Sequence, residues 1–171
     1  MKDGTILIWK YRKVNNWCRD LIPRLIVYFT KKPYVHAAIY FDEKTYESAA
    51  SGIRSTSGLK QVNEYWEPII SLTITERNSM QAYLLFTTNR KWKYNFFKLI
   101  ILSIVYPTRW FWNKIGWVPF DKDLFGEVCS VYVDEAWLFA GRDILPNEHE
   151  GYTSPGDLVE LSGFKKVDRK E

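Results

Sequence analysis

The sequence predicts a single α+β domain: an antiparallel, partly barrel-like sheet with a helix carrying Cys129 packed against it. The length of 171 residues and a hydrophobic share of 46% suit one buried core. Short β-rich segments gather in the first half of the chain and the clearest helical pattern lies in the second half, without the alternation of βαβ units. Neither an internal repeat nor a linker is evident, so residues 1–171 are expected to form one domain.

Most of the strands are expected in the first half of the chain. Residues 5–9 form a short apolar run after an Asp-Gly turn signal. Residues 35–41 (VHAAIYF) are continuously β-rich, as in a strand buried on both faces, and residues 45–50 return beside them as the second strand of a hairpin. Residues 69–74 (IISLTI) are predicted as a further strand, whereas residues 52–58 (GIRSTSG) are predicted as a loop.

Three helices are expected. The first covers about residues 17–27, and the second opens at Thr75 with a capping pattern. The third covers roughly residues 122–140, with Gly141 placed just after its end because glycine readily adopts the left-handed conformation that ends many helices. A short strand over residues 158–161 is expected to follow.

Composition and charge argue against several classes of protein. A net charge of +4 does not indicate a nucleic-acid-binding module, so we expect no nucleic-acid partner. Two cysteines without a Cys-x-x-Cys pair, and only two histidines, indicate neither a disulfide scaffold nor a zinc site, and no metal or cofactor is expected. The apolar N-terminal run and the stretch 96–106 are too short for a secretory signal or a membrane span. We therefore expect no export signal and a cytoplasmic location as synthesised.

Three residues far apart in the sequence carry the side chains that a cysteine nucleophile needs. Cys129 lies near the start of a predicted helix, where the helix dipole and a nearby imidazolium lower the pKa of a thiol. His36 begins a predicted strand and offers an imidazole that acts first as base and then as acid. Glu47, in the next strand of the hairpin, is expected across from His36, where a carboxylate fixes the imidazole tautomer. Each residue also has a structural interpretation: a small buried thiol, a core histidine and a solvated carboxylate.

Six short segments, in order along nearly the whole chain, carry a resemblance to a known family. They are DGTILIW (3–9), TKKPYVHAAI (30–39), TYESA (45–49), KYNF (93–96), EVCS (127–130) and SPGDL (154–158). Together they resemble the circularly permuted branch of the NlpC-type papain-like cysteine peptidases and amidases, in which the catalytic histidine precedes the cysteine. That branch also includes lecithin:retinol acyltransferase-like enzymes.

The resemblance implies a permuted papain-like fold and a cysteine hydrolase in which Cys129 is the nucleophile and His36 the base. Glu47 then orients the imidazole. The implied substrate is an amide, in a cell-wall peptide or a similar small amide-linked group. We expect Tyr34 and Tyr94 to line the substrate site, and the backbone N–H of Cys129 to stabilise the oxyanion.

The sequence departs from the family pattern in three places. Val35 stands where the family has a small residue or Ser before its histidine, and Asn95 stands where the family has Asp. Residues 96–120 form an aromatic-rich insertion, which is a candidate for contact with a membrane, a glycan or another protein. We favour the alternative that these aromatic side chains pack inward. The tryptophans of the insertion that would make such contacts are Trp110, Trp112 and Trp117.

Two other functions stay open on the same residues. One is acyl transfer or thioester hydrolysis on a lipid substrate by the same three side chains. The other is a non-catalytic structural subunit that keeps the fold within a larger assembly, such as a phage particle. The first would need acyl-chain or membrane binding, and the second would leave Cys129 unreactive.

Overall fold

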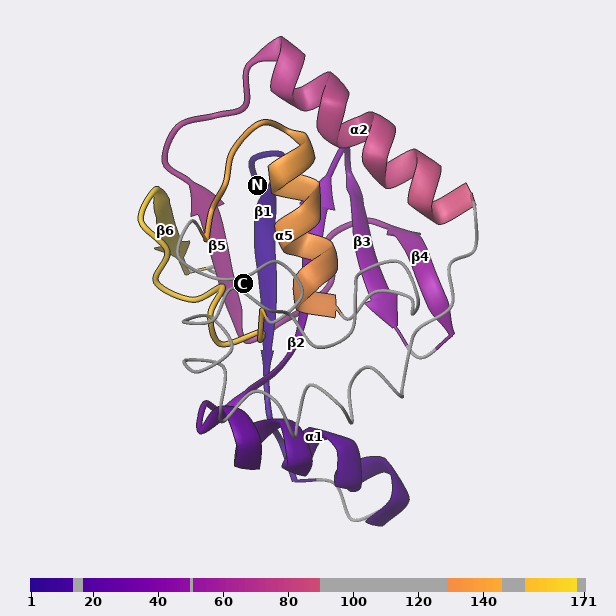
Figure 1. The fold of residues 1–171 in the computed structure, drawn as a ribbon, viewed down its shortest axis with the longest axis vertical. Helices are drawn as coiled ribbons and strands as arrows, with labels where there is room; N and C mark the ends of the chain where they lie inside the picture. Colours follow the sequence, from indigo (N-terminus) through magenta and orange to yellow (C-terminus); the bar gives the residue numbers. More distant parts are fainter. Residues whose placement is uncertain (14–16, 50, 90–128, 146–152, 169–171) are drawn as a thin grey trace, which may run out of the picture.

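The structure is a computed structural model in which residues 1–13, 17–49, 51–89, 129–145 and 153–168 are described (Figure 1). These residues form a six-stranded antiparallel sheet in the order β4-β3-β2-β1-β5-β6, together with three helices. The strands are β1 (Thr5–Lys10), β2 (Tyr34–Phe41), β3 (Lys44–Ala49), β4 (Gly52–Ser57), β5 (Glu64–Pro68) and β6 (Phe164–Val167). The helices are α1 (Trp17–Thr30), α2 (Ile74–Asn89) and α5 (Cys129–Phe139). The mixed helix and strand content and the antiparallel sheet predicted from the sequence are confirmed.

The sheet is open rather than closed. Among the described residues β4 and β6 form its two edges, so the predicted barrel-like character does not extend to closure. α5 and α2 lie on one face of the sheet, and α1 lies beyond the end of β1 and β2 (Figure 1). Because α5 packs against β2 and β3, the helix that begins with Cys129 covers the sheet as the sequence predicts.

A hydrophobic core fills the space between the sheet and the helices α2 and α5. The strands contribute alternate side chains, as expected where one face of a strand points to a core. Its fully buried members include Ile6, Ile8, Ala37, Ile39, Phe41, Met80, Leu84, Tyr132, Val133, Ala136 and Trp137. The opposite face of the central strands buries a smaller cluster of Leu7, Ala38 and Tyr65. The middle of β2 is therefore buried on both faces, which explains its continuous apolar sequence.

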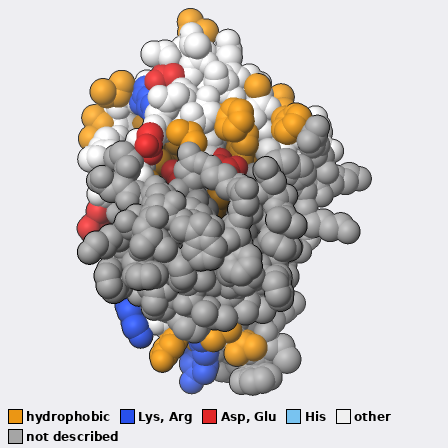
Figure 2. Space-filling model, viewed as in Figure 1, with side chains coloured by type: hydrophobic (Ala, Val, Ile, Leu, Met, Phe, Trp, Pro, Cys, Tyr) orange, Lys and Arg blue, Asp and Glu red, His pale blue; other side chains and the backbone are white. Residues whose placement is uncertain are grey.

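Hydrophobic side chains also reach the surface on the face that carries α2 and α5 (Figure 2). The exposed ones on these two helices include Leu85, Phe86, Leu138 and Phe139. Among the described residues no helix combines the length and the apolar character needed to cross a bilayer.

Two tight turns explain how the elements that hold the site are joined. β2 and β3 are connected by Asp42 and Glu43, whose φ angles of 48° and 57° are those of a two-residue hairpin turn. At the end of α5, Gly141 has a φ of 85°, and its N–H donates to Leu138 O while the N–H of Arg142 donates to Trp137 O. This pattern is a Schellman cap, so the predicted position of Gly141 after the helix is confirmed.

Two predicted segments in the first half of the chain are wrong. Residues 52–58 are not a loop: β4 pairs with β3 from Gly52 to Ser57, and its polar sequence fits an exposed edge strand. Residues 69–74 pair with no strand in the described part of the chain. Ile69 and Ile70 are 55% and 72% exposed there, and Ile74 already begins α2.

The last strand lies later than predicted. Residues 158–161 form a turn and a bend rather than a strand, with Leu158 fully buried in the main core and Val159 and Leu161 packed against that core. β6 follows at Phe164–Val167 and pairs with β5. The predicted helix over 122–140 is seen from Cys129 onward, and residues 122–128 lie outside the described part of the chain.

Candidate active site

The candidate site lies where two neighbouring strands of the sheet separate. The pairing of β2 with β3 ends at Ile39 and Tyr46. Pairing of β2 with β1 nevertheless continues to Tyr34, and pairing of β3 with β4 continues to Ala49. Because β2 and β3 extend beyond their last shared pair, groups at this end of the sheet can bind a third element, which is the start of α5.

His36 and Glu47 meet across this separation. His36 Nε2 lies 3.0 Å from Glu47 Oε2, and the side chains of the two residues are 26% and 3% exposed. The last paired residues, Ile39 and Tyr46, put Glu47 level with Ala38 rather than with His36. The contact is therefore diagonal rather than directly cross-strand, which long side chains on one face of a hairpin can span.

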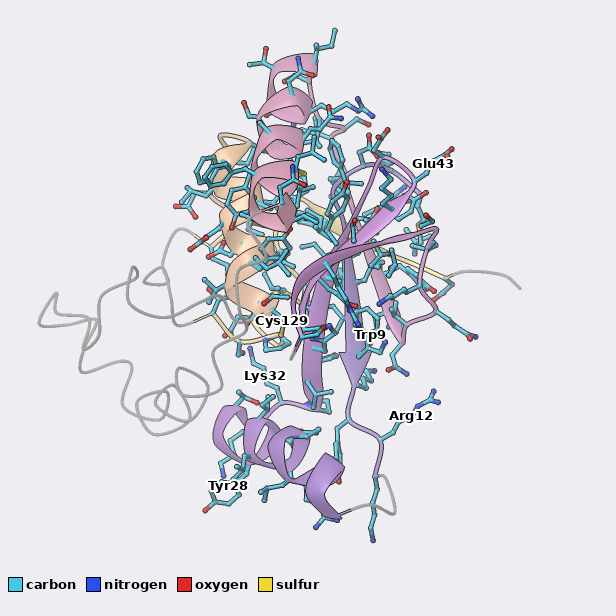
Figure 3. All side chains as sticks on the ribbon, turned by 90° about the vertical axis from the view of Figure 1, so that its right-hand side faces the viewer. Trp9, Arg12, Tyr28, Lys32, Glu43 and Cys129 are labelled. Atoms are coloured by element: carbon cyan, nitrogen blue, oxygen red, sulfur yellow. The ribbon has the colours of Figure 1, made fainter. Side chains whose placement is uncertain are left out.

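Cys129 is the first residue of α5 and approaches His36 from the end of the helix nearest to α1 (Figure 3). The residue is 2% exposed, and its thiol hydrogen-bonds to His36. Since His36 Nε2 contacts Glu47, Nδ1 is the ring nitrogen left for the sulfur. The backbone N–H groups of Ala37 and Ser130 also donate to the sulfur. The structure thus brings Cys129, His36 and Glu47 together in one hydrogen-bonded chain.

The charges of this chain favour a thiolate beside an imidazolium. Burial by itself raises the pKa of the Cys129 thiol, but the charge and hydrogen bond of His36 and two backbone N–H donors outweigh burial and lower that pKa below its ordinary value. Burial likewise opposes the charged form of His36, yet Cys129 and Glu47 together raise its pKa from 6.5 to about 9. With a pKa of about 9, the imidazole of His36 holds a proton at neutral pH, and each group of the pair stabilises the charged form of the other.

Two cations hold the second oxygen of Glu47. Its Oε1 accepts a hydrogen bond from Arg54 Nε at 2.7 Å and another from Lys60 Nζ. Burial raises the pKa of the Glu47 carboxyl, but the hydrogen bonds from His36, Lys60 and Arg54 outweigh burial and keep that pKa well below its ordinary value. Neither cation is predicted from the sequence, because residues 52–58 resemble a loop. In the structure Arg54 is the cross-strand partner of Glu47 in β4, so a correct strand prediction would have found it.

Residues 153–158 brace the start of α5. Ser130 Oγ donates to the carbonyl of Thr153. Asp157 accepts from the backbone N–H and the hydroxyl of Ser154, at 2.9 and 2.6 Å, and from Lys32 Nζ at 2.7 Å. Lys32 lies between the start of α5 and α1 (Figure 3). This network connects the segment just before β2, and hence His36, to the segment that holds the start of α5.

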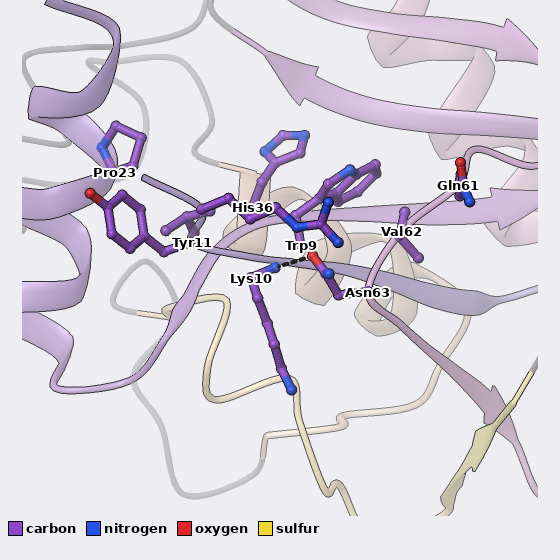
Figure 4. Close-up of a pocket in the computed structure, with 10 residues that line it drawn as sticks. Trp9, Lys10, Tyr11, Pro23, His36, Gln61, Val62 and Asn63 are labelled. Atoms are coloured by element: carbon purple, nitrogen blue, oxygen red, sulfur yellow. Dashed lines mark hydrogen bonds between the residues drawn. The ribbon is translucent and has the colours of Figure 1, made fainter. Parts of the chain in front are cut away.

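A pocket of about 470 Å³ opens beside His36 (Figure 4). Its walls come from the end of β1, the start of β2, α1 and residues 61–63. Trp9 and His36 stand together in this wall, with ring centroids 4.9 Å apart. The pocket therefore adjoins the residue that interacts with the Cys129 thiol. Among the described residues no group of three or more His, Cys, Asp or Glu side chains is arranged to hold a metal ion.

Of the two tyrosines predicted to line the substrate site, Tyr34 is described and Tyr94 is not. Tyr34 pairs with Lys10 and packs on the main core, and it is not among the residues that line the pocket. Tyr94 and the insertion at 96–120 lie outside the described residues, so their predicted roles stay predictions. No protein-family model matches the chain, and no curated protein shows significant similarity to it.

Proposed function

We propose that this chain is a cysteine hydrolase of the permuted papain-like class and that it cleaves an amide bond. The observation that carries the proposal is the chain of interactions from buried Cys129 through partly exposed His36 to buried Glu47. It contains the nucleophile, the base and the orienting carboxylate in the order that a thiol hydrolase requires. The order of the residues in the sequence, His36 before Cys129, supports the permuted branch.

The reaction follows from the protonation states of the pair. The Cys129 thiolate attacks the amide carbonyl carbon, and the negative charge moves to the carbonyl oxygen. His36 gives its Nδ1 proton to the nitrogen of the leaving amine as the carbon–nitrogen bond breaks, which leaves a thioester on Cys129. His36, now neutral, takes a proton from water, and the resulting hydroxide attacks the thioester. The acid product leaves, and the thiolate–imidazolium pair is restored.

Glu47 keeps the imidazole in the state that this sequence of steps needs. Its carboxylate accepts a hydrogen bond from Nε2–H, so Nδ1 faces the sulfur in both protonation states of the ring. Arg54 and Lys60 donate hydrogen bonds to the other carboxylate oxygen, and these bonds hold the Glu47 side chain in this orientation. We assign the oxyanion to the backbone N–H of Cys129 at the start of α5.

The proposed substrate is a cell-wall peptide or a similar small amide-linked group. The family resemblance supports this class, and a pocket of about 470 Å³ beside His36 is within the range of volumes that hold small ligands. Acyl transfer or thioester hydrolysis on a lipid would use the same three side chains and would differ in preferring esters with long acyl chains. A structural subunit would form no covalent intermediate at all.

Trapping the thioester tests the proposal. The wild-type chain is incubated with a set of short peptide amides and with acyl thioesters, quenched in acid, and digested for mass spectrometry. We expect an acyl group on Cys129 and turnover of at least one amide, both lost in Cys129→Ala. Cys18→Ala is the matched control and should retain both. An acyl group that forms only from long-chain thioesters would favour the lipid alternative over amide hydrolysis. Turnover that survives Cys129→Ala would contradict the proposal that Cys129 is the nucleophile.

A further inference from the structure

The pocket beside His36 extends away from the triad toward the end of the molecule that α1 occupies. Pro23 of α1 and residues 61–63 line it on two sides, and Trp9 and His36 line it between them (Figure 4). Cys129 itself is not one of the lining residues, so His36 is the member of the triad that the pocket adjoins. Because His36, the partner of Cys129, is in its wall, the pocket is the described cavity that can hold a group attached to one side of the scissile bond.

The pocket is positively charged. Lys10 and Arg12 line it, and among the described residues no carboxylate side chain does. Lys10 Nζ is neutralised by Glu64 Oε1 at 2.7 Å. Arg12, in contrast, is exposed and makes no hydrogen bond or ion pair with the described part of the chain. A third lining residue, Tyr11, accepts a hydrogen bond from Arg24 Nε at 3.1 Å.

The polar groups of the wall also favour an anion. Asn63 Oδ1 accepts from the backbone N–H of Lys10 at 2.7 Å, so the end of the amide left for a ligand is its NH₂ donor (Figure 4). Lys and Arg side chains gather on the surface at this end of the molecule (Figure 2). A planar guanidinium with a nearby amide donor matches the two oxygens of a carboxylate.

We infer that this pocket binds a carboxylate of the substrate through Arg12, so that the chain acts on amides carrying a free carboxylate a few bonds from the scissile amide. The inference deepens the proposed function and rests on it. Arg12 is here a substrate-binding residue, and it sets specificity rather than the chemistry at the sulfur. Neutral amides of the same shape should react more slowly because they leave the guanidinium in the pocket unpaired.

Alkylation with a matched series of reagents tests the inference. The reagents are iodoacetamido acids with two to five methylenes between the amide and the carboxylate, and the corresponding primary amides. The second-order rate of modification at Cys129 is measured by peptide mapping. We expect the acid to react about tenfold faster than its amide at one chain length. That preference should be lost in Arg12→Gln.

Lys13→Gln is the matched control for Arg12→Gln. It removes one positive charge one residue away, at an exposed position that does not line the pocket. The preference for the acid should persist in this variant. Equal rates for acids and amides in the wild-type chain, or the same loss of preference in both variants, would overturn the inference.

A binding measurement separates failure of this inference from failure of the proposed function. The unreactive acetamido acids and amides are titrated into Cys129→Ala, and the indole N–H signal of Trp9 is followed by NMR. A shift with the acids alone, lost in the double variant with Arg12→Gln, supports the carboxylate site even if Cys129 proves no more reactive than Cys18. No shift with any acid contradicts the site even if the thiol is activated.

Discussion

Replacing Glu47 by glutamine tests whether this side chain contributes both to the chemistry of the site and to the stability of the fold. The carboxylate is almost fully buried, with Oε2 at 3.0 Å from His36 Nε2 and Oε1 bonded to Arg54 and Lys60. A glutamine amide presents one oxygen and one NH₂ group, so it can satisfy the imidazole or the two cations but not both. If its NH₂ faces His36, the ring must carry its proton on Nδ1, which is the wrong tautomer for a base.

The expected loss of stability follows from these contacts. A hydrogen bond to a charged group contributes about 1.5–3 kcal/mol when buried. The side chains of Arg54 and Lys60 are 51% and 28% exposed, so water replaces much of what they lose. We therefore expect Glu47→Gln to lower the free energy of unfolding by about 2–3 kcal/mol at pH 7, rather than the sum of three buried bonds. The rate of turnover should fall by about 10²-fold or more.

The depressed pKa of Glu47 determines how its contribution to the free energy of unfolding changes with pH. Because the folded-state pKa of Glu47 is depressed below its ordinary value of 4.5, its contribution to stability is present above pH 4.5 and is lost as the pH falls through the folded-state pKa. The difference between wild type and Glu47→Gln should therefore shrink in acid.

Urea unfolding followed by tryptophan fluorescence at pH 7 and pH 3 measures this difference. Glu43→Gln, in the exposed turn between β2 and β3, is the matched control and should change the free energy of unfolding by less than about 0.5 kcal/mol. A Glu47→Gln variant that is as stable as wild type at pH 7, or a difference that is the same at both pH values, would refute the reasoning.

Two further predictions concern contacts that support the site. In Gly4→Ala the new Cβ would lie 2.5 Å from Cζ2 of Trp137 at a φ of +86°, so we expect a loss of about 3 kcal/mol in the free energy of unfolding. Gly58→Ala, at a φ of +79° in open space, should lose only about 1 kcal/mol, and equal losses in urea unfolding would contradict the clash. Lys32→Met removes the cation that is 2.7 Å from buried Asp157 and should cost about 1–2 kcal/mol at pH 7; an unchanged urea midpoint would show that the ion pair contributes nothing.

Local sequence signals predict the elements that carry the candidate site. The hairpin of β2 and β3 follows from two β-rich runs around a short polar turn, and Gly141 marks the end of α5. The contact between His36 and Glu47 follows from that hairpin, although the exact register does not. Cys129 could be placed on a helix because the apolar spacing around it is helical. These signals are local, so they do not require knowledge of the whole sheet.

The wrong predictions concern segments whose structure depends on whether a neighbouring strand is available for pairing. β4 has the polar sequence of a loop and is a strand because β3 offers it a complete edge to pair with, which brings Arg54 to Glu47. Residues 69–74 have the sequence of a strand, but they pair with none in the described part of the chain, and Arg142 instead binds the carbonyls of Ile70 and Ser71. Propensity cannot distinguish these cases, because strand pairing depends on residues distant in the sequence.

The activation of Cys129 by His36 is the central claim, and the pH dependence of iodoacetamide alkylation at Cys129 tests it most directly. The rate is measured from pH 4 to pH 10 in wild type and in His36→Ala, with Cys18 as the internal control in the same digest. Because the Cys129 pKa is lowered and the His36 pKa is raised to about 9, we predict rapid alkylation that persists well below pH 8 in wild type. In His36→Ala that reaction should be lost below pH 8 and return only as the thiol ionises unaided. Alkylation of Cys129 as slow as that of Cys18, and unchanged in His36→Ala, would contradict the account.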